Sequence, residues 1–366
     1  MSSRPSSPAG ARREGRAHAN DFPYIDPGGL TAMFIVQNYS LAVVFCVLTM
    51  LCWGSWANAR KLAPAEWRFE LFYWDYALGV LLIAFLFGIT LGNAGRLGRP
   101  FFADLHQASA ASLGHALFGG AVFNLANILL VAAIEVAGMA VAFPIGIGLA
   151  LVLGVILNYI AVPVGNPALL AVGVALVTVA IVLDAIAYRR QAKSAVRMSV
   201  KGLLLSLACG IFMGVFYRFV AASMYPNPAH PVPGLMGSYA AVFVFAVGVF
   251  LSNFLWNTIA MRWPVMGDPL PFSHYWRGRF NTHLAGLLGG VIWGIGMSLN
   301  ISASGRAGFA ISYGLGQGAT MIAALWGVFV WREFKSPARG VTALLALMFV
   351  CFIAGLGVIV LSRTIG

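Results

Sequence analysis

Charged residues are scarce in this sequence, and their scarcity narrows the class of protein. Only 9% of the 366 residues are charged, 60% are hydrophobic, and the mean hydropathy is +0.86. A soluble globular protein carries about 25% charged residues. The composition therefore excludes a water-soluble fold, and with it collagen-like, disordered and nucleic-acid-binding chains. It indicates an integral membrane protein.

Cysteines and catalytic motifs are also few. The four cysteines lie inside apolar runs without paired spacing, so they predict neither a disulfide framework nor a metal site. The sequence contains no Walker A loop and no HExxH motif, and its six histidines are scattered. We therefore expect no ATP-driven transport, no bound metal, no cofactor and no enzymatic activity.

Ten apolar runs make up most of the chain. A membrane-spanning helix needs about 20 such residues, so the sequence predicts an all-α polytopic membrane protein with ten transmembrane helices. The runs lie near residues 39–58, 71–91, 112–134, 138–159, 167–187, 201–223, 236–258, 283–302, 306–330 and 341–361.

Residues 1–32 precede the first run and are polar, without the apolar segment of a signal peptide. We expect these residues to form a disordered tail. If Met33 is the true start, the tail is not translated. The remaining chain divides into a first five-helix unit (33–190), a basic linker loop (191–200) and a second five-helix unit (201–366).

The positive charges predict the orientation of the chain. Of the 23 Lys and Arg residues, fourteen lie in or beside the odd-numbered connections between spans, and only four lie near the membrane on the opposite side. Cytoplasmic loops of membrane proteins collect Lys and Arg. We therefore expect a multi-pass protein of the inner (plasma) membrane, with odd-numbered connections in the cytoplasm and both termini outside.

An internal repeat links the two halves. With a shift of 170 residues, residues 119–148 align on 289–318 without a gap, and nine of thirty positions are identical, most of them Gly or Ala. Each half holds five spans, and an odd number forces the copies into opposite orientations. The sequence thus predicts a 5+5 inverted repeat, which supplies the two equivalent states that alternating access requires.

Corresponding interruptions mark spans 4 and 9. Pro144, Gly146 and Gly148 correspond to Gly314, Gly316 and Gly318. Paired Gly/Pro interruptions are typical of a transport site with locally broken helices. Tight packing of small residues is the alternative.

Three acidic residues lie in or at the ends of the spans: Asp75, Glu135 and Asp184. Ionisable groups inside a membrane are costly and are candidates for function. We expect Asp75 and Glu135 to take part in proton coupling. The alternatives are a helix N-terminus for Asp75, a capping role for Glu135 and an interfacial position for Asp184.

Side-chain amides offer hydrogen-bond donors and acceptors to a neutral solute, and tryptophan rings stack on a sugar or a heterocycle. The alternatives are bonds between helices for the amides and an interfacial belt for the tryptophans. The candidate substrate-binding residues are Trp56, Asn58, Asn124, Asn127, Asn158, Trp293 and Gln317.

Short segments in a fixed order carry a family resemblance. They are "MFIVQNYSLAVVFCVLTMLCWGSW", "WDYALGVLL", "GGAVFNLANI", "LNY", "GRFNTHLAGLLGGVIWGIG" and "LWGVFVWREF". With two five-span halves, the chain resembles the drug/metabolite transporter superfamily, and within it the ureide permease and glucose/ribose/rhamnose porter branch.

The resemblance implies a proton-linked or facilitative permease with a central cavity lined by spans 1, 3, 4, 6, 8 and 9. It carries a role over to Trp56, Asp75, Asn127, Asn158, Trp293 and Glu333. Three features depart from the family, one of which is a central loop between spans 5 and 6 that is shorter than in plant ureide permeases. Met297 stands at the repeat position of Asn127, and many superfamily exporters place both termini in the cytoplasm.

We therefore expect a secondary transporter that takes up a small polar solute together with protons. A sugar stands slightly ahead of a purine-derived ureide. The alternatives are an exporter of the same superfamily and a non-transporting membrane sensor or scaffold. The expected partners are the solute, protons and the lipid bilayer but no nucleic acid, and a homodimer is left open.

Overall fold

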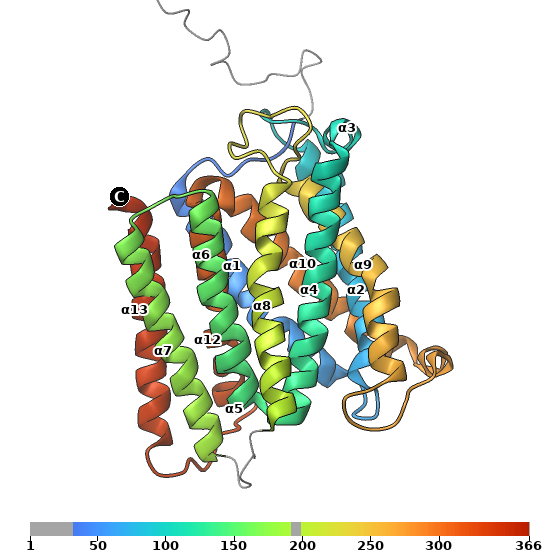
Figure 1. Ribbon diagram of the computed structural model, residues 1–366, viewed down its shortest axis with the longest axis vertical. Coiled ribbons are helices and arrows are strands. Elements are labelled where there is room, and N and C mark those ends of the chain that lie inside the picture. Colours follow the sequence, from blue (N-terminus) through green and yellow to red (C-terminus); the bar gives the residue numbers. More distant parts are fainter. Residues whose placement is uncertain (1–31, 192–198, 366) are drawn as a thin grey trace, which may run out of the picture.

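The chain folds into a bundle of long helices (Figure 1). The computed structural model describes residues 32–191 and 199–365. Ten helices in these residues are long and apolar enough to cross a membrane, which confirms the ten predicted spans. The predicted tail, apart from Ala32, and most of the predicted linker loop 191–200 lie outside the described residues.

The spans follow the predicted runs to within a few residues. In chain order they are α1 with the 3₁₀-helix η1 (Tyr39–Ser55, Trp56–Leu62), α2 with the 3₁₀-helix η2 (Phe69–Ile89, Leu91–Asn93), α4 (Ala110–Ala137), the π-helix η3 with α6 (Phe143–Ile147, Gly148–Ala161), α7 (Pro167–Gln191), α8 (Val200–Ala222), α9 (Ser238–Arg262), α10 (Phe280–Ala307), α11 and α12 with the π-helix η5 (Phe309–Gly316, Ala319–Leu325, Trp326–Val330) and α13 (Val341–Thr364). Short helices between them are α3 (Phe101–Gln107), α5 (Met139–Ala142) and η4 (Phe272–Arg277).

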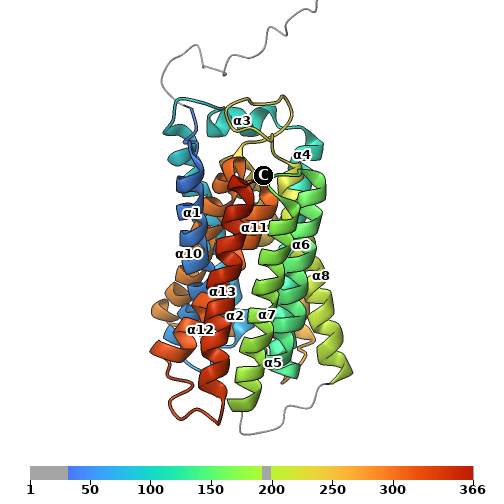
Figure 2. The same cartoon turned by 90° about the vertical axis from the view of Figure 1, so that its left-hand side faces the viewer.

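The connections gather at the two ends of the bundle. α3 and the 223–237 connection lie at the end where α13 finishes, here called the terminal end (Figures 1 and 2). The connections 63–68, 263–279 and 331–340 lie at the opposite end, here called the basic end because it carries most of the Lys and Arg residues counted above. Which side of the membrane each end faces stays a prediction.

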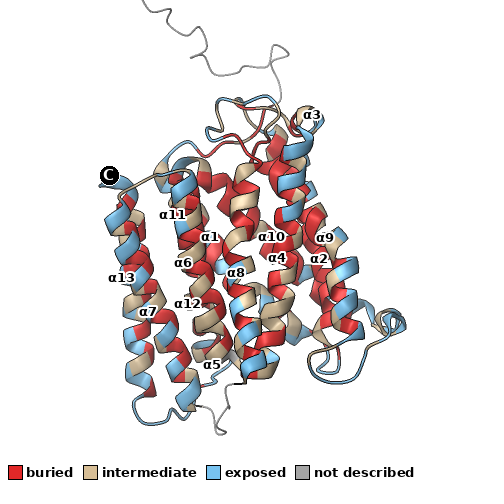
Figure 3. Ribbon diagram, viewed as in Figure 1, coloured by how far each residue is buried: buried red, intermediate tan, exposed pale blue. Residues whose placement is uncertain are grey.

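The outer faces of the bundle carry exposed apolar side chains. Phe254 of α9 and Ile353 of α13 are examples, and exposed residues follow the outer sides of α7, α9 and α13 (Figure 3). Lipid is the solvent that such a surface fits, since spans of this length match the thickness of the hydrocarbon layer.

Glycines allow the closest contacts between helices. A Cβ on Gly290 of α10 would overlap the backbone oxygen of Tyr76 on α2, and a Cβ on Gly120 of α4 would overlap that of Phe245 on α9. Helices in lipid associate through such close packing of small residues rather than through hydrophobic burial.

These two contacts also correspond to each other in the predicted repeat. Gly120 and Gly290 are 170 residues apart, and so are Gly138 and Gly308, which end α4 and α10 with φ angles of 74° and 90°. α4 runs towards the basic end, whereas α10 starts there. Such pairs are what an inverted repeat would produce, and the repeat itself stays a prediction.

At the terminal end, hydrogen bonds of Asp104 connect α3 with the segment before it and with the start of α9. Its side chain is buried, and its Oδ1 accepts a hydrogen bond from Nη1 of Arg99 at 2.9 Å. Its Oδ2 accepts one from the backbone N–H of Gly237 at 2.5 Å, directly before α9. Burial raises the pKa of Asp104 from its ordinary 3.8 to about 6, although the Gly237 and Arg99 bonds act in the opposite direction.

Adding one methyl group at the contact of α2 and α10 should destabilise the protein. Gly290→Ala forces the backbones apart, at a cost of about 1–3 kcal/mol for an overpacked interior. Gly114→Ala on α4 is the matched control, because a Cβ there meets open space. We expect thermal unfolding of the detergent-solubilised protein at a lower temperature for Gly290→Ala only. Equal unfolding temperatures for the two variants would contradict this account.

The raised pKa of Asp104 should make the stability depend on pH. The folded protein keeps this proton up to about pH 6, whereas the unfolded chain loses it near the ordinary value of 3.8, so stability falls as the pH rises through that window. Between pH 5 and pH 7 the group should lower the free energy of unfolding by about 1 kcal/mol. We expect a lower unfolding temperature at pH 7 than at pH 5, and a smaller difference in Asp104→Asn. The same difference in both proteins would exclude this group as the cause.

Candidate solute-binding cavity

A cavity of about 290 Å³ lies inside the bundle. Its lining begins at Trp293 and Phe123, at the midpoints of α10 and α4, and extends to Arg60 and the exposed Ala57 of η1. The cavity therefore reaches from the middle of the bundle towards the basic end. Its volume is at the lower limit of about 300 Å³ that is usual for small-molecule sites.

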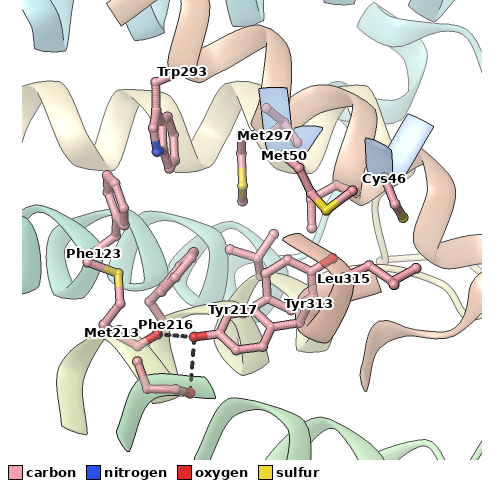
Figure 4. Close-up of a cluster of buried hydrophobic side chains, with 14 of the residues drawn as sticks. Cys46, Met50, Phe123, Met213, Phe216, Tyr217, Trp293, Met297, Tyr313 and Leu315 are labelled. Carbon is pink, nitrogen blue, oxygen red and sulfur yellow. Dashed lines mark hydrogen bonds between the residues drawn. The ribbon is translucent and has the colours of Figure 1, made fainter. Parts of the chain in front are cut away.

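Aromatic rings form the inner end of the cavity (Figure 4). The ring of Trp293 stacks with that of Trp53, with centroids 5.7 Å apart, and with that of Phe123 at 4.3 Å. The ring of Phe216 lies 5.1 Å from that of Phe123. These flat faces suit a planar solute, because offset stacking adds to the energy of burial.

Buried hydrogen bonds occupy the bundle beyond these rings. The hydroxyl of Tyr217 donates to Oδ1 of Asn300 at 2.6 Å, and Nδ2 of Asn300 donates to the backbone oxygen of Ser312 at 2.9 Å. The hydroxyl of Tyr313 lies 2.9 Å from the backbone oxygen of Met213 (Figure 4). On α10 the cavity lining does not extend beyond Trp293, so the cavity is closed towards the terminal end.

Two amides supply polar groups to the cavity. Asn127 of α4 donates from Nδ2 to the hydroxyl of Tyr73 at 3.0 Å, and its Oδ1 makes no hydrogen bond with the described residues. Gln317 lies between α11 and α12, and its side-chain amide also has no partner among the described residues. The cavity thus offers a free carbonyl from Asn127 and a complete amide from Gln317.

Both predicted interruptions alter the helix geometry beside the cavity. Span 4 begins with the π-helix η3, whose Phe143 and Ile147 line the cavity, and span 9 is broken at Gln317 and Gly318. A Cβ on Gly318 would overlap the sulfur of Met50. Close packing and a broken helix therefore occur together in span 9. Single π-turns are frequent at functional sites.

Three predicted amides lie outside the cavity lining. Asn124 donates from Nδ2 to Oγ of Ser252 on α9 at 2.9 Å, and Asn158 donates to the backbone oxygen of Gly154 at 2.8 Å. Asn58 accepts a hydrogen bond from Nε1 of Trp331 at 2.6 Å. Trp56, Asn127, Trp293 and Gln317 are the predicted substrate-binding residues that the structure brings together.

The predicted coupling carboxylates also lie outside the cavity lining, and apart from each other. Asp75 of α2 accepts a hydrogen bond from the Tyr275 hydroxyl at 2.5 Å and lies 2.9 Å from Nδ1 of His283. Glu135 is exposed and lines a separate cavity of about 230 Å³ together with Glu70. Across the described ranges, His, Cys, Asp and Glu side chains form no group of three that could hold a metal ion.

Several lining residues were not predicted. Phe123 and Phe216 stand in apolar runs like many other phenylalanines, and Thr320 has no distinguishing neighbour in the sequence. Arg60 is one of the basic residues counted in the odd-numbered connections and was not predicted to line a cavity. It lines this cavity near the basic end, where its guanidinium donates to the backbone oxygen of Pro64 at 3.2 Å. His283, which contacts Asp75, is not among the predicted site residues either.

Comparison with known proteins agrees with this architecture. A family model described as ureide permease matches residues 72–197 and 184–362. Ureide permease 1 and ureide permease 2 of Arabidopsis thaliana are each 24% identical to the chain, over 90% of the chain and 99% of each relative. A protein of known crystal structure has the same fold, with a TM-score of 0.57 at 16% identity over 90% of this chain and 99% of that chain.

The resemblance seen in the sequence is thus confirmed for its ureide permease branch, and these relatives are named as permeases rather than as enzymes. The chain belongs to the ureide permease family.

Proposed function

We propose that this protein is a secondary transporter that carries a small ureide through the central cavity. Membership of the family and the names of the relatives support a ureide. The lining supports it over a sugar, because it is largely aromatic and aliphatic with few polar groups. A sugar would bury many hydroxyls, each of which costs free energy without a partner.

The free carbonyl of Asn127 and the side-chain amide of Gln317, which has no partner among the described residues, lie beside aromatic rings, and this observation carries the proposal. A ureide contains a flat N–CO–N group with one carbonyl acceptor and several N–H donors. Oδ1 of Asn127 accepts from such a donor, and the amide of Gln317 both donates and accepts. Stacking against Phe123 or Trp293 suits the planarity of the same group.

The proposed orientation follows the positive charges. We place the protein in the plasma membrane of the cell with its basic end on the cytoplasmic side. In the described conformation the cavity then faces the cytoplasm. The predicted inverted repeat supplies an opposite conformation that faces outwards. An exporter would use the same cavity in the reverse direction, whereas a sensor or scaffold would bind the solute without moving it.

Purified protein in liposomes should take up radiolabelled allantoin, a cyclic ureide, with saturation. Asn127→Leu and Gln317→Leu each remove one polar partner worth roughly 1–2 kcal/mol, which corresponds to about fivefold to thirtyfold weaker binding. Gln37→Leu is the matched control, because its amide is exposed before α1.

Uptake of glucose but not of allantoin would contradict the proposed substrate. Binding without uptake would support a sensor, and allantoin that accumulates outside energised cells would support an exporter. Equal effects of all three amide variants would show that the cavity amides are not the binding groups.

We further propose that uptake is coupled to protons through Asp75, with Glu135 as the second predicted coupling residue. Asp75 is only 4% exposed, although it lies within a membrane span. Carboxylates in such positions are typical of proton pathways in transporters. The exposed position of Glu135 makes it the weaker choice.

Wild-type uptake should rise when a pH gradient that drives protons with the solute is imposed on the liposomes. Asp75→Asn keeps the size of the side chain but cannot release a proton, so we expect this variant to lose the response to the gradient while it still exchanges solute. Uptake that is indifferent to the gradient, and that survives Asp75→Asn unchanged, would show that the coupling is wrong.

A further inference from the structure

Asp75 is held between two groups from a distant part of the chain. Its Oδ1 accepts from the hydroxyl of Tyr275 in η4 at 2.5 Å, and its Oδ2 lies 2.9 Å from Nδ1 of His283 near the start of α10. His283 is the one base within 4.0 Å of this carboxylate among the described residues. Nothing in the local sequence around Asp75 indicates either partner.

The second ring nitrogen of His283 faces away from the carboxylate, towards the basic end. A Cβ on Gly278 would lie 2.5 Å from this Nε2, and the ring of Trp67 meets that of His283 edge-on with centroids 5.4 Å apart. Gly278 and Trp67 both line a surface cavity of about 560 Å³ at the basic end. The imidazole therefore stands between this cavity and the buried Asp75.

Other charged groups surround the cavity but do not pair with Asp75. Arg68 at the start of α2 forms its ion pair with Glu70. Arg68 does not line the cavity; the titratable or charged residues that do, on the 63–68 connection, η4 and the segment before α10, are Glu66, His274, Arg277 and Arg279. The hydrogen bond from Tyr275 leaves its hydroxyl proton on the phenol, so that residue orients the carboxylate.

Asp75 is also placed to affect the solute cavity. On the same helix, Tyr73 accepts the hydrogen bond of Asn127, and the ring of Tyr76 lies 4.7 Å from that of Trp56. A Cβ on Gly286 of α10 would lie 2.5 Å from that of Asp75, so α2 and α10 are in close contact here. A change in the charge of Asp75 therefore acts on a helix that carries contacts of two cavity residues.

We propose that His283 relays protons between water at the basic end and Asp75, with Tyr275 as a positioning residue. This inference rests on the proposed proton coupling and assigns the group that delivers the proton. In the relay, Nε2 of the neutral imidazole takes a proton from a hydronium ion, which leaves water, and the proton on Nδ1 passes to Oδ2 of Asp75, which leaves the neutral ring protonated on Nε2. When Asp75 releases its proton, Nδ1 takes it back and Nε2 returns its own proton to water, so the ring regains its first tautomer and no other bond changes.

His283→Gln tests the relay, because a glutamine amide still hydrogen-bonds to Asp75 but does not carry a proton. Liposomes are assayed for allantoin uptake with and without the imposed pH gradient, and for proton movement with a pH-sensitive dye. We expect His283→Gln to lose gradient-driven uptake and solute-dependent proton movement, while it keeps allantoin binding and exchange. A structural role alone would weaken binding and exchange as well.

The matched controls are His274→Gln, which lines the same cavity, and His115→Gln, which is exposed at the opposite end. Both should respond to the gradient as the wild type does. If wild-type uptake ignores the gradient, the proposed coupling itself fails. If the wild type responds and His283→Gln responds equally, only the relay is wrong.

A measurement without a variant at position 283 covers the case in which His283→Gln does not fold. Diethylpyrocarbonate modifies accessible imidazoles, and peptide mass spectrometry gives the modified fraction of His283 in the His274→Gln protein. The gradient response should fall in proportion to the modification of His283. A full response after His283 has been modified would overturn the inference.

Discussion

The direct contact of α2 with α10 is the constraint on which the rest of the site depends. Cβ atoms on Gly79 or Gly290 would overlap backbone atoms of the opposite helix, so no side chain separates the two backbones at these points. In lipid, where burial of apolar surface gives no net drive between helices, such packing holds a pair together. The contact sets the rotation of α2 about its axis, and with it the directions in which the other side chains of α2 point.

Two consequences follow on opposite sides of α2. Tyr73 and Tyr76 contact Asn127 and Trp56 of the candidate solute cavity, whereas Asp75 contacts His283 and Tyr275. The candidate solute cavity and the proposed coupling carboxylate therefore involve one helix, although the carboxylate does not line that cavity. In the proposed coupling, a carboxylate outside the cavity changes its charge without losing a solute contact, which suits a transporter that must bind and release its solute.

The amides show how far the sequence alone leads. Asn124 and Asn127 lie one helical turn apart on α4 and have the same chemistry, yet Asn127 lines the cavity and Asn124 bonds to Ser252 of α9. A helix that is apolar all round has no polar face to show which side is interior. The spacing of the two residues predicts a shared face, but it does not tell which neighbour each one meets.

The composition and the order of residues within short segments were sufficient to predict the ten spans, the distribution of basic residues between the two ends and the repeated glycines. Each depends on hydropathy, charge or spacing within a short segment. Only the tertiary structure decided that His283 and Tyr275, 208 and 200 residues away, reach Asp75, and that Gln317 joins Asn127 at one cavity. Those contacts depend on which helices pack together and on the rotation of each helix about its axis. Neither can be predicted from a sequence that is apolar on nearly all sides of every helix.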